Sequence, residues 1–420
     1  MNRNMLRKMS ICLVVFAVHF TANALPISEK QAFNIATSFM KDRKFDNNRV
    51  KSLSYNYNST YHPYYIFNDV NKEGFVIVSG ESNTGTVLAY SYTGSFDTDN
   101  LPENVSWWLE RCANVMEVIK KQKISHTITT ENVTRTTVSP LLRTQWGQNY
   151  PYNLKCPILN GEQCVTGCVA TAVAQIMKYY NYPESSKATY NYRTRTNKIS
   201  MPALPEAHFD WDNTKNSYSE NSSDIEKDAV ATLMQYCGCV LSMDYGINGS
   251  GADATPVCDA MEYFFAYDSA ITKIYRKDYS SDEWDEILYG ELAKSRPVFY
   301  SGETKEKTGH AFVCDGYDNG YFHINWGWDG SCDGYFKLSI LDPYLDSYST
   351  DNSDAGYSSE QLAVINIVPK GYETIIEDMT LHNGYSCTYY NLNGLATAKL
   401  HKGINIIKMS DGTTKKVVVK

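Results

Sequence analysis

The chain has 420 residues, of which 43% are hydrophobic and 20% are charged, and its formal net charge is −8. This length predicts two or three domains, and the apolar content is sufficient for a sizeable core. The mildly acidic balance, without a dense stripe of lysine and arginine, argues against a nucleic-acid-binding protein.

The N-terminus has the pattern of an export signal. A basic region at residues 3–8 precedes a short apolar run at 11–20 and a small-x-small cleavage site at 22–24. The run is too short to span a bilayer, and a buried N-terminal helix is the alternative reading. We expect residues 1–24 to be removed and the mature protein to be exported without a transmembrane anchor.

Residues 28–122 are predicted to form an α+β unit of their own. A helix is expected over 28–42, because Ser28 and Gln31 have capping-box spacing ahead of an amphipathic pattern. Short apolar runs separated by turn residues predict strands, and a second amphipathic pattern predicts a helix. The expected strands are 64–67, 74–78 and 87–90, and the expected helix is 105–121.

Residues 123–139 are polar, threonine-rich and without core-forming periodicity. They are typical of a linker that a protease cuts, and we place the cut near 132–136. The following chain is globular in composition as far as residue 369, and strand alternation returns near the C-terminus. The predicted division is therefore 25–135, 136–369 and 370–420.

Thr166 to Tyr180 is a predicted helix with a chemically distinctive start. Thr166 and Gly167 interrupt the preceding chain, and Cys168 opens the helix. A helix N-terminus offers unpaired amides and positive potential, which lower a thiol pKa and favour the nucleophilic thiolate. A packed structural cysteine is the alternative at this position.

A second segment supplies a candidate base. His310 follows Gly309 at the start of a predicted strand, which turns and returns as a second strand ending near Asn325 and Trp326. The hairpin is expected to set Asn325 beside the imidazole, where it would fix the tautomer, with Trp326 shielding the bond from water. A core histidine is the structural alternative, and His323 is the competing base.

The spacing of the two residues adds specificity. Cys168 precedes His310 by 142 residues. A cysteine near the start of a catalytic domain, followed about 130–150 residues later by a histidine, is the papain-like order.

Three segments carry a resemblance to a known family. GCVATAVAQIMKYYNYP, GHAFVCDGY and NWGWDGSCDGYFKL resemble the streptopain family of secreted bacterial cysteine peptidases, over about residues 140–369. The upstream GFVIVSGES and LPENVSWWLE resemble that family's inhibitory propeptide. The resemblance implies an α+β, papain-like two-lobed peptidase domain, preceded by an α+β propeptide. It also implies a secreted endopeptidase made as a zymogen, with protein or peptide substrates and its own propeptide as inhibitor.

The resemblance assigns roles residue by residue. Cys168 matches the nucleophile, His310 the general base, and Gln148, in WGQNYPYN, the glutamine of the oxyanion hole. A side-chain amide at that position can donate to a developing oxyanion. Asn325 occupies the position of the papain-like asparagine.

Four further residues are implied in substrate binding: Gly251, Gly309, Trp326 and Trp328. The tryptophans match an aromatic pair flanking the histidine, and the glycines line the cleft, where their backbone groups would meet an extended peptide. The C-G-[SA]-C-[WY] form of papain is absent. The end of the chain resembles a secretion sorting tail, with a plain accessory β segment as the alternative.

Eleven cysteines are present, and Cys12 would leave with the signal. We interpret most of the others as buried small apolar residues, and disulfides remain open because export permits them. Cys237-Gly-Cys239 is not a zinc-type spacing, so the sequence predicts no metal and no other cofactor.

Two other functions remain compatible with the sequence. One is a catalytically silent peptide-binding relative, and the other is a Cys-His cell-wall amidase. The oligomeric state is not indicated by the sequence.

Overall fold

The computed structural model describes residues 25–45, 62–82, 87–99, 101–122, 135–303, 309–338 and 359–372, and four strands between 387 and 419. The chain divides into two compact units, Met1–Lys370 and Gly371–Lys420. The predicted export signal, residues 123–134 of the predicted linker and residues 345–358 lie outside the described residues; the last of these belong to a segment rich in Ser, Asp, Gly and Tyr, 345–360, which the sequence predicts as a loop. No helix in the described ranges has the length and apolar character needed to cross a membrane.

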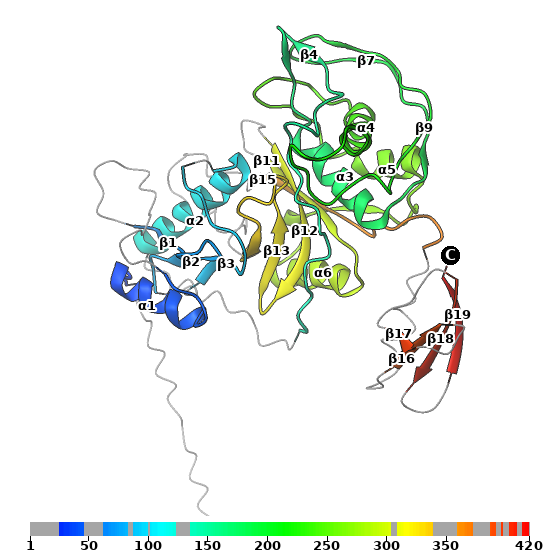
Figure 1. Cartoon of the computed structure of the whole chain (residues 1–420). Coiled ribbons are helices and arrows are strands. Elements are labelled where there is room, and N and C mark those ends of the chain that lie inside the picture. Colours follow the sequence, from blue (N-terminus) through cyan, green and yellow to red (C-terminus); the bar gives the residue numbers. More distant parts are fainter. Residues whose placement is uncertain are drawn as a thin grey trace, which may run out of the picture. The chain divides into compact units, whose positions relative to one another are not determined.

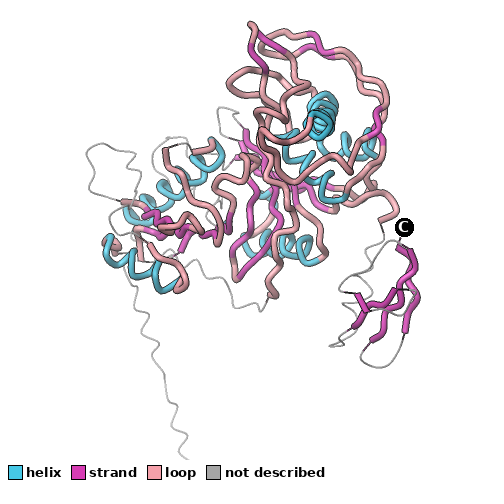
Figure 2. The backbone as a smooth tube through the Cα atoms, viewed as in Figure 1, coloured by secondary structure: helices cyan, strands magenta, loops and turns pink. Residues whose placement is uncertain are grey.

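A nine-stranded antiparallel sheet runs through the first unit (Figures 1 and 2), in the order β1-β2-β3-β14-β13-β12-β11-β15-β10. Its strands are β1 Tyr64–Asn68, β2 Phe75–Ser79, β3 Val87–Ser91, β10 Thr272–Tyr275, β11 Val298–Glu303, β12 Gly309–Asp318, β13 Tyr321–Asn325, β14 Gly334–Phe336 and β15 Ser359–Ile365. The three strands expected in the N-terminal region are confirmed as β1, β2 and β3.

Two helices cover opposite faces of the N-terminal strands. The helix α1 (Glu29–Phe39) starts from the expected capping box, in which the Ser28 side chain accepts from the Gln31 amide. Ala32 and Ala36 of α1 pack into one cluster with alternate residues of β1 and β2. The helix α2 (Glu103–Gln122) buries its tryptophans against the other face of the same strands.

The N-terminal region is joined to the rest of the first unit through the sheet and through a shared hydrophobic cluster. Strand β3 pairs with β14, with Tyr90 opposite Tyr335 and Ala89 opposite Phe336. Trp108 of α2 meets Phe336 edge-on, with ring centroids 4.9 Å apart. Both regions therefore share one sheet and one hydrophobic cluster. Strand alternation in a sequence shows which side chains are buried, but not which sheet edge a strand will join.

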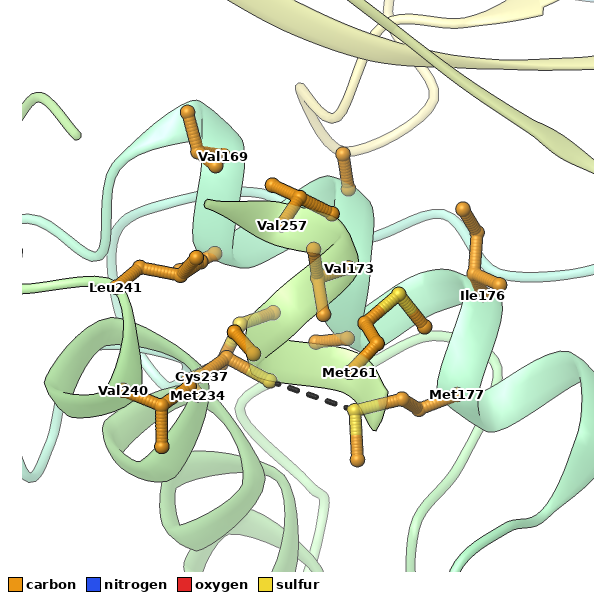
Figure 3. Packing of buried hydrophobic residues seen from close by; sticks show 14 of the residues in the cluster. Val169, Val173, Ile176, Met177, Met234, Cys237, Val240, Leu241, Val257 and Met261 are labelled. Carbon is orange, nitrogen blue, oxygen red and sulfur yellow. Dashed lines mark hydrogen bonds between the residues drawn. The ribbon is translucent and has the colours of Figure 1, made fainter. Parts of the chain in front are cut away.

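Helices α3, α4 and α5 form a lobe on one face of the sheet (Figure 1). Figure 3 shows Val169, Val173 and Met177 of α3 packed against α4 and α5. The helix α6 lies on the opposite face and buries Trp284 and Leu288 against β11 and β12. The bounds are α3 Cys168–Tyr180, α4 Asp224–Val240, α5 Val257–Phe265, α6 Ser281–Ala293 and the short 3-10 helix η2 Arg276–Asp278.

The helical lobe also contains three small two-stranded sheets. They pair β4 with β5, β6 with β9, and β7 with β8, all antiparallel. Their bounds are β4 Ile158–Leu159, β5 Glu162–Gln163, β6 Ser185–Ser186, β7 Tyr192–Arg193, β8 Ser200–Met201 and β9 Ala207–His208. The β4–β5 hairpin leads directly into the segment that precedes Cys168.

The second unit is a four-stranded antiparallel sheet in the order β17-β16-β18-β19. Its strands are β16 Cys387–Asn391, β17 Ala396–Thr397, β18 Gly403–Met409 and β19 Thr414–Val419. The predicted strand character of the C-terminal segment is confirmed.

The end of the predicted linker is bound to the sheet. Val138 and Tyr317 exchange two backbone hydrogen bonds of 2.8 Å. Thr137 Oγ1 donates to Asp318 Oδ1 (2.9 Å), and Arg135 forms an ion pair of 2.7 Å with Glu286. Residues 135–138 therefore belong structurally to the sheet domain.

The cysteines whose side chains the structure describes, nine in number, are buried thiols. The interpretation of most of the cysteines as buried small residues is confirmed for this part of the chain.

Candidate active site

The start of α3 is shaped by Gly167. This residue has φ 88° and ψ 143° and lies at the N-cap without any side-chain cap. A β-carbon on Gly167 would lie 2.6 Å from Met243 Sδ and 2.9 Å from Ser250 O. Only glycine accepts both the positive φ and this crowding, so the chain can turn sharply and leave Cys168 as the first residue of the helix.

Cys168 is buried, with 7% of its surface exposed. Its Sγ accepts a hydrogen bond from the Ala311 amide (3.4 Å). Burial raises the pKa of the Cys168 thiol, but the hydrogen bond and charge of His310 and the amides of Ala311 and Val169 lower the pKa further, so the balance lies below the usual value. These groups act in the direction that favours a thiolate.

The structure brings His310 to this thiol from the sheet. His310 is the second residue of β12, lies opposite Gly302 of β11 and is 9% exposed. Alternation along β12 places it on the same face as Phe312, whose ring lies 4.8 Å from that of Trp326. Trp326 is thus on the histidine's side of the sheet.

Asn325 does not serve the imidazole in the expected way. Its Oδ1 accepts from Gln175 Nε2 (2.9 Å) and from Gly327 N (3.1 Å), so both acceptor positions of the oxygen are occupied. Its Nδ2 donates to Thr144 O (2.8 Å). The expectation that this amide accepts a hydrogen bond from His310 is therefore wrong for this structure.

The cause is a β-bulge. The β12–β13 register shifts between Cys314 and Gly316, so Asp315 is an extra residue and Asn325 pairs with Val313. In an unbroken ladder Asn325 would pair with Cys314 and share a face with His310, because pairing keeps side chains on one face and alternation has period two. The bulge turns Asn325 to the opposite face, where α3 lies.

Gln148 is held close to the helix start. Its carbonyl accepts from the Thr166 amide (3.1 Å), two residues before Cys168, and its side chain is 6% exposed. The preceding residues are fixed from the sheet side, because the Asp329 amide donates to Trp146 O (3.0 Å). The Asp329 carboxylate lies directly over Gly147, where a β-carbon would collide with it.

The four residues implied in substrate binding have different surroundings. Gly309 is exposed at the start of β12, and Trp328 is half-buried at the edge of the sheet cluster. Trp326 is buried in that cluster. Gly251 is exposed and exchanges backbone hydrogen bonds with Asp244 (2.9 and 3.3 Å), so its amide is already used while its carbonyl keeps a second lone pair.

Sequence reasoning missed a buried charged group behind the site. His323 Nδ1 lies 2.6 Å from Asp315 Oδ1, and Asp333 Oδ1 accepts from the Trp326 amide (2.9 Å). Burial lowers the pKa of His323, but Asp315 raises it more, and burial raises the pKa of Asp333 to about 7. His323, the competing base, is thus engaged with Asp315. The sequence signal for this group was Asp315, an aspartate within the otherwise apolar strand β12.

Sequence reasoning also missed Thr144 and Gln175. Thr144 Oγ1 donates to Gln175 Oε1 (2.7 Å), and both side chains are buried. The signal was a glutamine seven residues after Cys168, on the same helix face within a run of apolar residues.

The chain is similar to known cysteine peptidases and to their inhibitory propeptides. The model of the Peptidase C10 family matches residues 146–336, and that of the Spi protease inhibitor matches residues 24–116. Streptopain of Streptococcus pyogenes serotype M28 is 35% identical over 326 residues, which cover 73% of this chain and 80% of streptopain. The thiol protease/hemagglutinin PrtT of Porphyromonas gingivalis is 34% identical over 338 residues, which cover 76% of this chain and 38% of PrtT.

Among solved structures, a prointerpain A fragment of Prevotella intermedia superposes with a TM-score of 0.64 at 31% identity, covering 76% of this chain and 98% of the fragment. The fold and the extent of these similarities establish the class: this chain belongs to the Peptidase C10 family and is a cysteine endopeptidase made as a zymogen, with a papain-like domain behind an inhibitory propeptide.

Proposed function

We propose that Cys168 is the nucleophile of this peptidase and that His310 is its proton-transfer partner. The observation that carries the proposal is the Cys168 thiol at the first residue of α3, beside the Ala311 amide. Burial opposes its ionisation, yet His310 and the neighbouring amides hold its pKa below the usual value. A thiolate beside an imidazolium supplies both the attacking atom and the proton that the leaving group needs.

The reaction follows from these two groups. The thiolate sulfur bonds to the scissile carbonyl carbon, and the carbonyl oxygen takes the negative charge. The imidazolium gives its proton to the amide nitrogen, the C–N bond breaks, and a thioester remains on Cys168. A water molecule then loses its proton to His310 and attacks the thioester, which releases the carboxylate product and restores the ion pair.

Gln148 is the proposed side-chain donor to the oxyanion. Its backbone is tied to Thr166, and its neighbours are tied to Asp329, which fixes the segment beside the helix start. The amide of Cys168 is the natural second donor, because the first amides of a helix have no intrahelical acceptor. Two fixed donors stabilise the charge that develops on the carbonyl oxygen.

Extended segments of proteins are the proposed substrates. Gly309 is exposed immediately before His310, so its backbone can approach a bound peptide closely. Trp328 is half-buried and would form part of the wall beside the tryptophan that packs near His310. The Gly251 amide is left out of this proposal because Asp244 already accepts its hydrogen bond.

The precursor organisation completes the proposal. Residues 1–24 act as an export signal that leads to secretion or to the bacterial cell surface, the chain from residue 25 to the activating cut as the inhibitory propeptide, and 370–420 as a sorting or accessory segment. The activating cut lies before Arg135. This position is supported by the docking of residues 135–138 on the sheet, because a protease binds the segment that it cuts in an extended and accessible form.

The experiment combines a thiol-directed probe with a peptide-cleavage assay on the precursor and on the processed enzyme. Cys168→Ala and His310→Ala should each abolish cleavage while near-ultraviolet circular dichroism and Tm remain close to those of wild type. Cys258→Ala and His208→Ala are matched controls, since Cys258 is buried in the helical lobe and His208 is exposed on β9. Cleavage at the wild-type rate by folded Cys168→Ala would overturn the proposal.

A further inference from the structure

Two of the segments that carry proposed catalytic groups, and the strand paired with the third, each contribute one residue to a closed ring of hydrogen bonds. The segment ending at Gln148 contributes Thr144, the helix that begins with Cys168 contributes Gln175, and the strand paired with β12 contributes Asn325. Thr144 Oγ1 donates to Gln175 Oε1 (2.7 Å), Gln175 Nε2 donates to Asn325 Oδ1 (2.9 Å), and Asn325 Nδ2 donates to Thr144 O (2.8 Å).

The ring lies in the seam between α3 and the sheet. Cys168, Thr171 and Gln175 are spaced by three and four residues, so they share one face of α3. Along this seam Cys168 Sγ meets the Ala311 amide (3.4 Å), and a β-carbon on Gly327 would lie 3.2 Å from Thr171 Cγ2. The opposite side of the helix carries the apolar side chains that pack against α4 and α5 (Figure 3).

The ring is buried, and its hydrogen bonds determine which amide atoms are oxygen and which are nitrogen. Gln175 is 0% exposed, and Thr144 and Asn325 are each 4% exposed. Because Asn325 Oδ1 also accepts from the Gly327 amide, this atom must be the oxygen, and the Gln175 atom facing it must be the nitrogen. The remaining Gln175 oxygen is then the acceptor that the Thr144 hydroxyl needs. Each polar side-chain atom in the ring has a hydrogen-bond partner, and a substitution would leave a buried group unsatisfied.

We propose that Gln175 is a positioning residue for catalysis, and that through the ring with Thr144 and Asn325 it sets Gln148, Cys168 and His310 at their mutual distances. This inference rests on the proposed roles of those three residues. Gln175 touches neither substrate nor the reacting atoms. It acts through α3 and through the strand that pairs with β12.

The physical reason is the division of the site between two lobes. Cys168 comes from a helix and His310 from a sheet, so no local structure fixes their separation. A displacement of about 1 Å at a reacting group can lower a rate by about 10²-fold. Apolar contacts hold the two layers together but tolerate small slides, whereas hydrogen bonds between three segments fix direction as well as distance.

The test uses shape-conserving variants in the full-length chain, processed to the active enzyme. Gln175→Met removes both ring hydrogen bonds of the side chain, and Thr144→Val removes only the hydroxyl bond while the backbone acceptor stays. Thr144→Ser is the rescuing partner because it keeps the hydroxyl. Val173→Ala is the matched control, since it removes buried apolar atoms from the side of α3 that faces the helical lobe.

We expect Gln175→Met and Thr144→Val to lower kcat by about tenfold or more with KM within about twofold, because geometry at the reacting groups is disturbed more than peptide binding. Thr144→Ser should retain kcat within about twofold. The double variant should lose little more than the worse single variant, since both break one network. The pH profile of Cys168 alkylation should shift upward in both ring variants and stay unchanged in Val173→Ala.

Two outcomes would overturn the inference. One is wild-type kcat in folded Thr144→Val or Gln175→Met. The other is a loss of kcat in Val173→Ala equal to that of a ring variant with the same fall in Tm, which would reduce Gln175 to a residue of general stability. The Cys168→Ala control distinguishes failure of this inference from failure of the proposed function. Cleavage that survives Cys168→Ala would refute the catalytic assignment itself.

Discussion

Replacement of Gly167 by alanine tests the local geometry that presents the Cys168 thiol. Gly167 combines a φ of 88° with a position where a β-carbon would press on Met243 Sδ at 2.6 Å and on Ser250 O at 2.9 Å. The methionine can move, but the carbonyl is backbone and cannot. The change therefore either strains this turn or shifts the first residue of α3.

The magnitude follows from two contributions to the free energy of unfolding. A β-carbon at positive φ costs about 1–2 kcal/mol, and overpacking in a filled interior costs about 1–3 kcal/mol. Gly167→Ala should thus destabilise by about 2–5 kcal/mol. Gly161 separates the two contributions: its φ is +87° and an added β-carbon would meet nothing within 4 Å, so Gly161→Ala should cost only the first.

The assay is urea unfolding of the precursor, together with kcat of the processed enzyme. Gly249→Ala completes the series, because this glycine has open space and no positive φ. The loss in free energy of unfolding should be smallest for Gly249→Ala, larger for Gly161→Ala and largest for Gly167→Ala. Only Gly167→Ala should lower kcat strongly, by about 10²-fold for a displacement near 1 Å. Equal destabilisation by Gly161→Ala and Gly167→Ala would refute the crowding argument, and an unchanged kcat would refute the link to the thiol.

Three further predictions concern the oxyanion, a buried acid and the propeptide. Gln148→Ala should lower kcat by about 10²–10³-fold with little change in KM, and an unchanged kcat in steady-state assays would exclude it as an oxyanion donor. Burial raises the pKa of Asp333 to about 7, so its contribution to stability is present below the unfolded value near about 4 and is lost as pH rises through about 7. Asp333→Asn should flatten the fall in Tm between about pH 5 and about pH 8, and a slope identical to wild type would contradict this. Trp108→Ala should cost about 3–5 kcal/mol and raise the cleavage activity of uncut precursor, whereas a destabilised but equally silent precursor would place inhibition elsewhere.

The shared core gives the last of these predictions its physical basis. Trp108 of α2 packs edge-on against Phe336, and β3 completes the sheet beside β14. Tyr90 OH also donates to Asp318 Oδ2 (2.6 Å), and Tyr321 OH donates to Val87 O (3.0 Å). Separation of the propeptide therefore requires loss of apolar contacts, of the β3–β14 backbone hydrogen bonds and of two tyrosine hydroxyl hydrogen bonds, in addition to the cut in the chain.

The sequence alone determined the parts of this protein that depend on contiguous residues. The capping box at Ser28, the helix that begins with Cys168 and the strand that begins beside His310 are local patterns, and each is present in the structure. The lowered pKa of the Cys168 thiol was predictable in part, because the first turn of a helix creates positive potential wherever the helix packs. The order and spacing of the cysteine and histidine then indicated the papain-like class.

Only the tertiary structure decided which partners the residues around the site have. The extra residue Asp315 shifts the pairing of β12 with β13 by one residue, so Asn325 pairs with Val313. The Asn325 side chain therefore points away from His310 and toward Gln175. A single extra residue in a strand leaves no clear trace in a period-two pattern, yet it exchanges the two faces of the ladder. The pairing of Gly251 with Asp244 and of β3 with β14 was hidden for a related reason: a sequence pattern specifies which groups are buried, while their partners are set by long-range contacts between segments far apart in the chain.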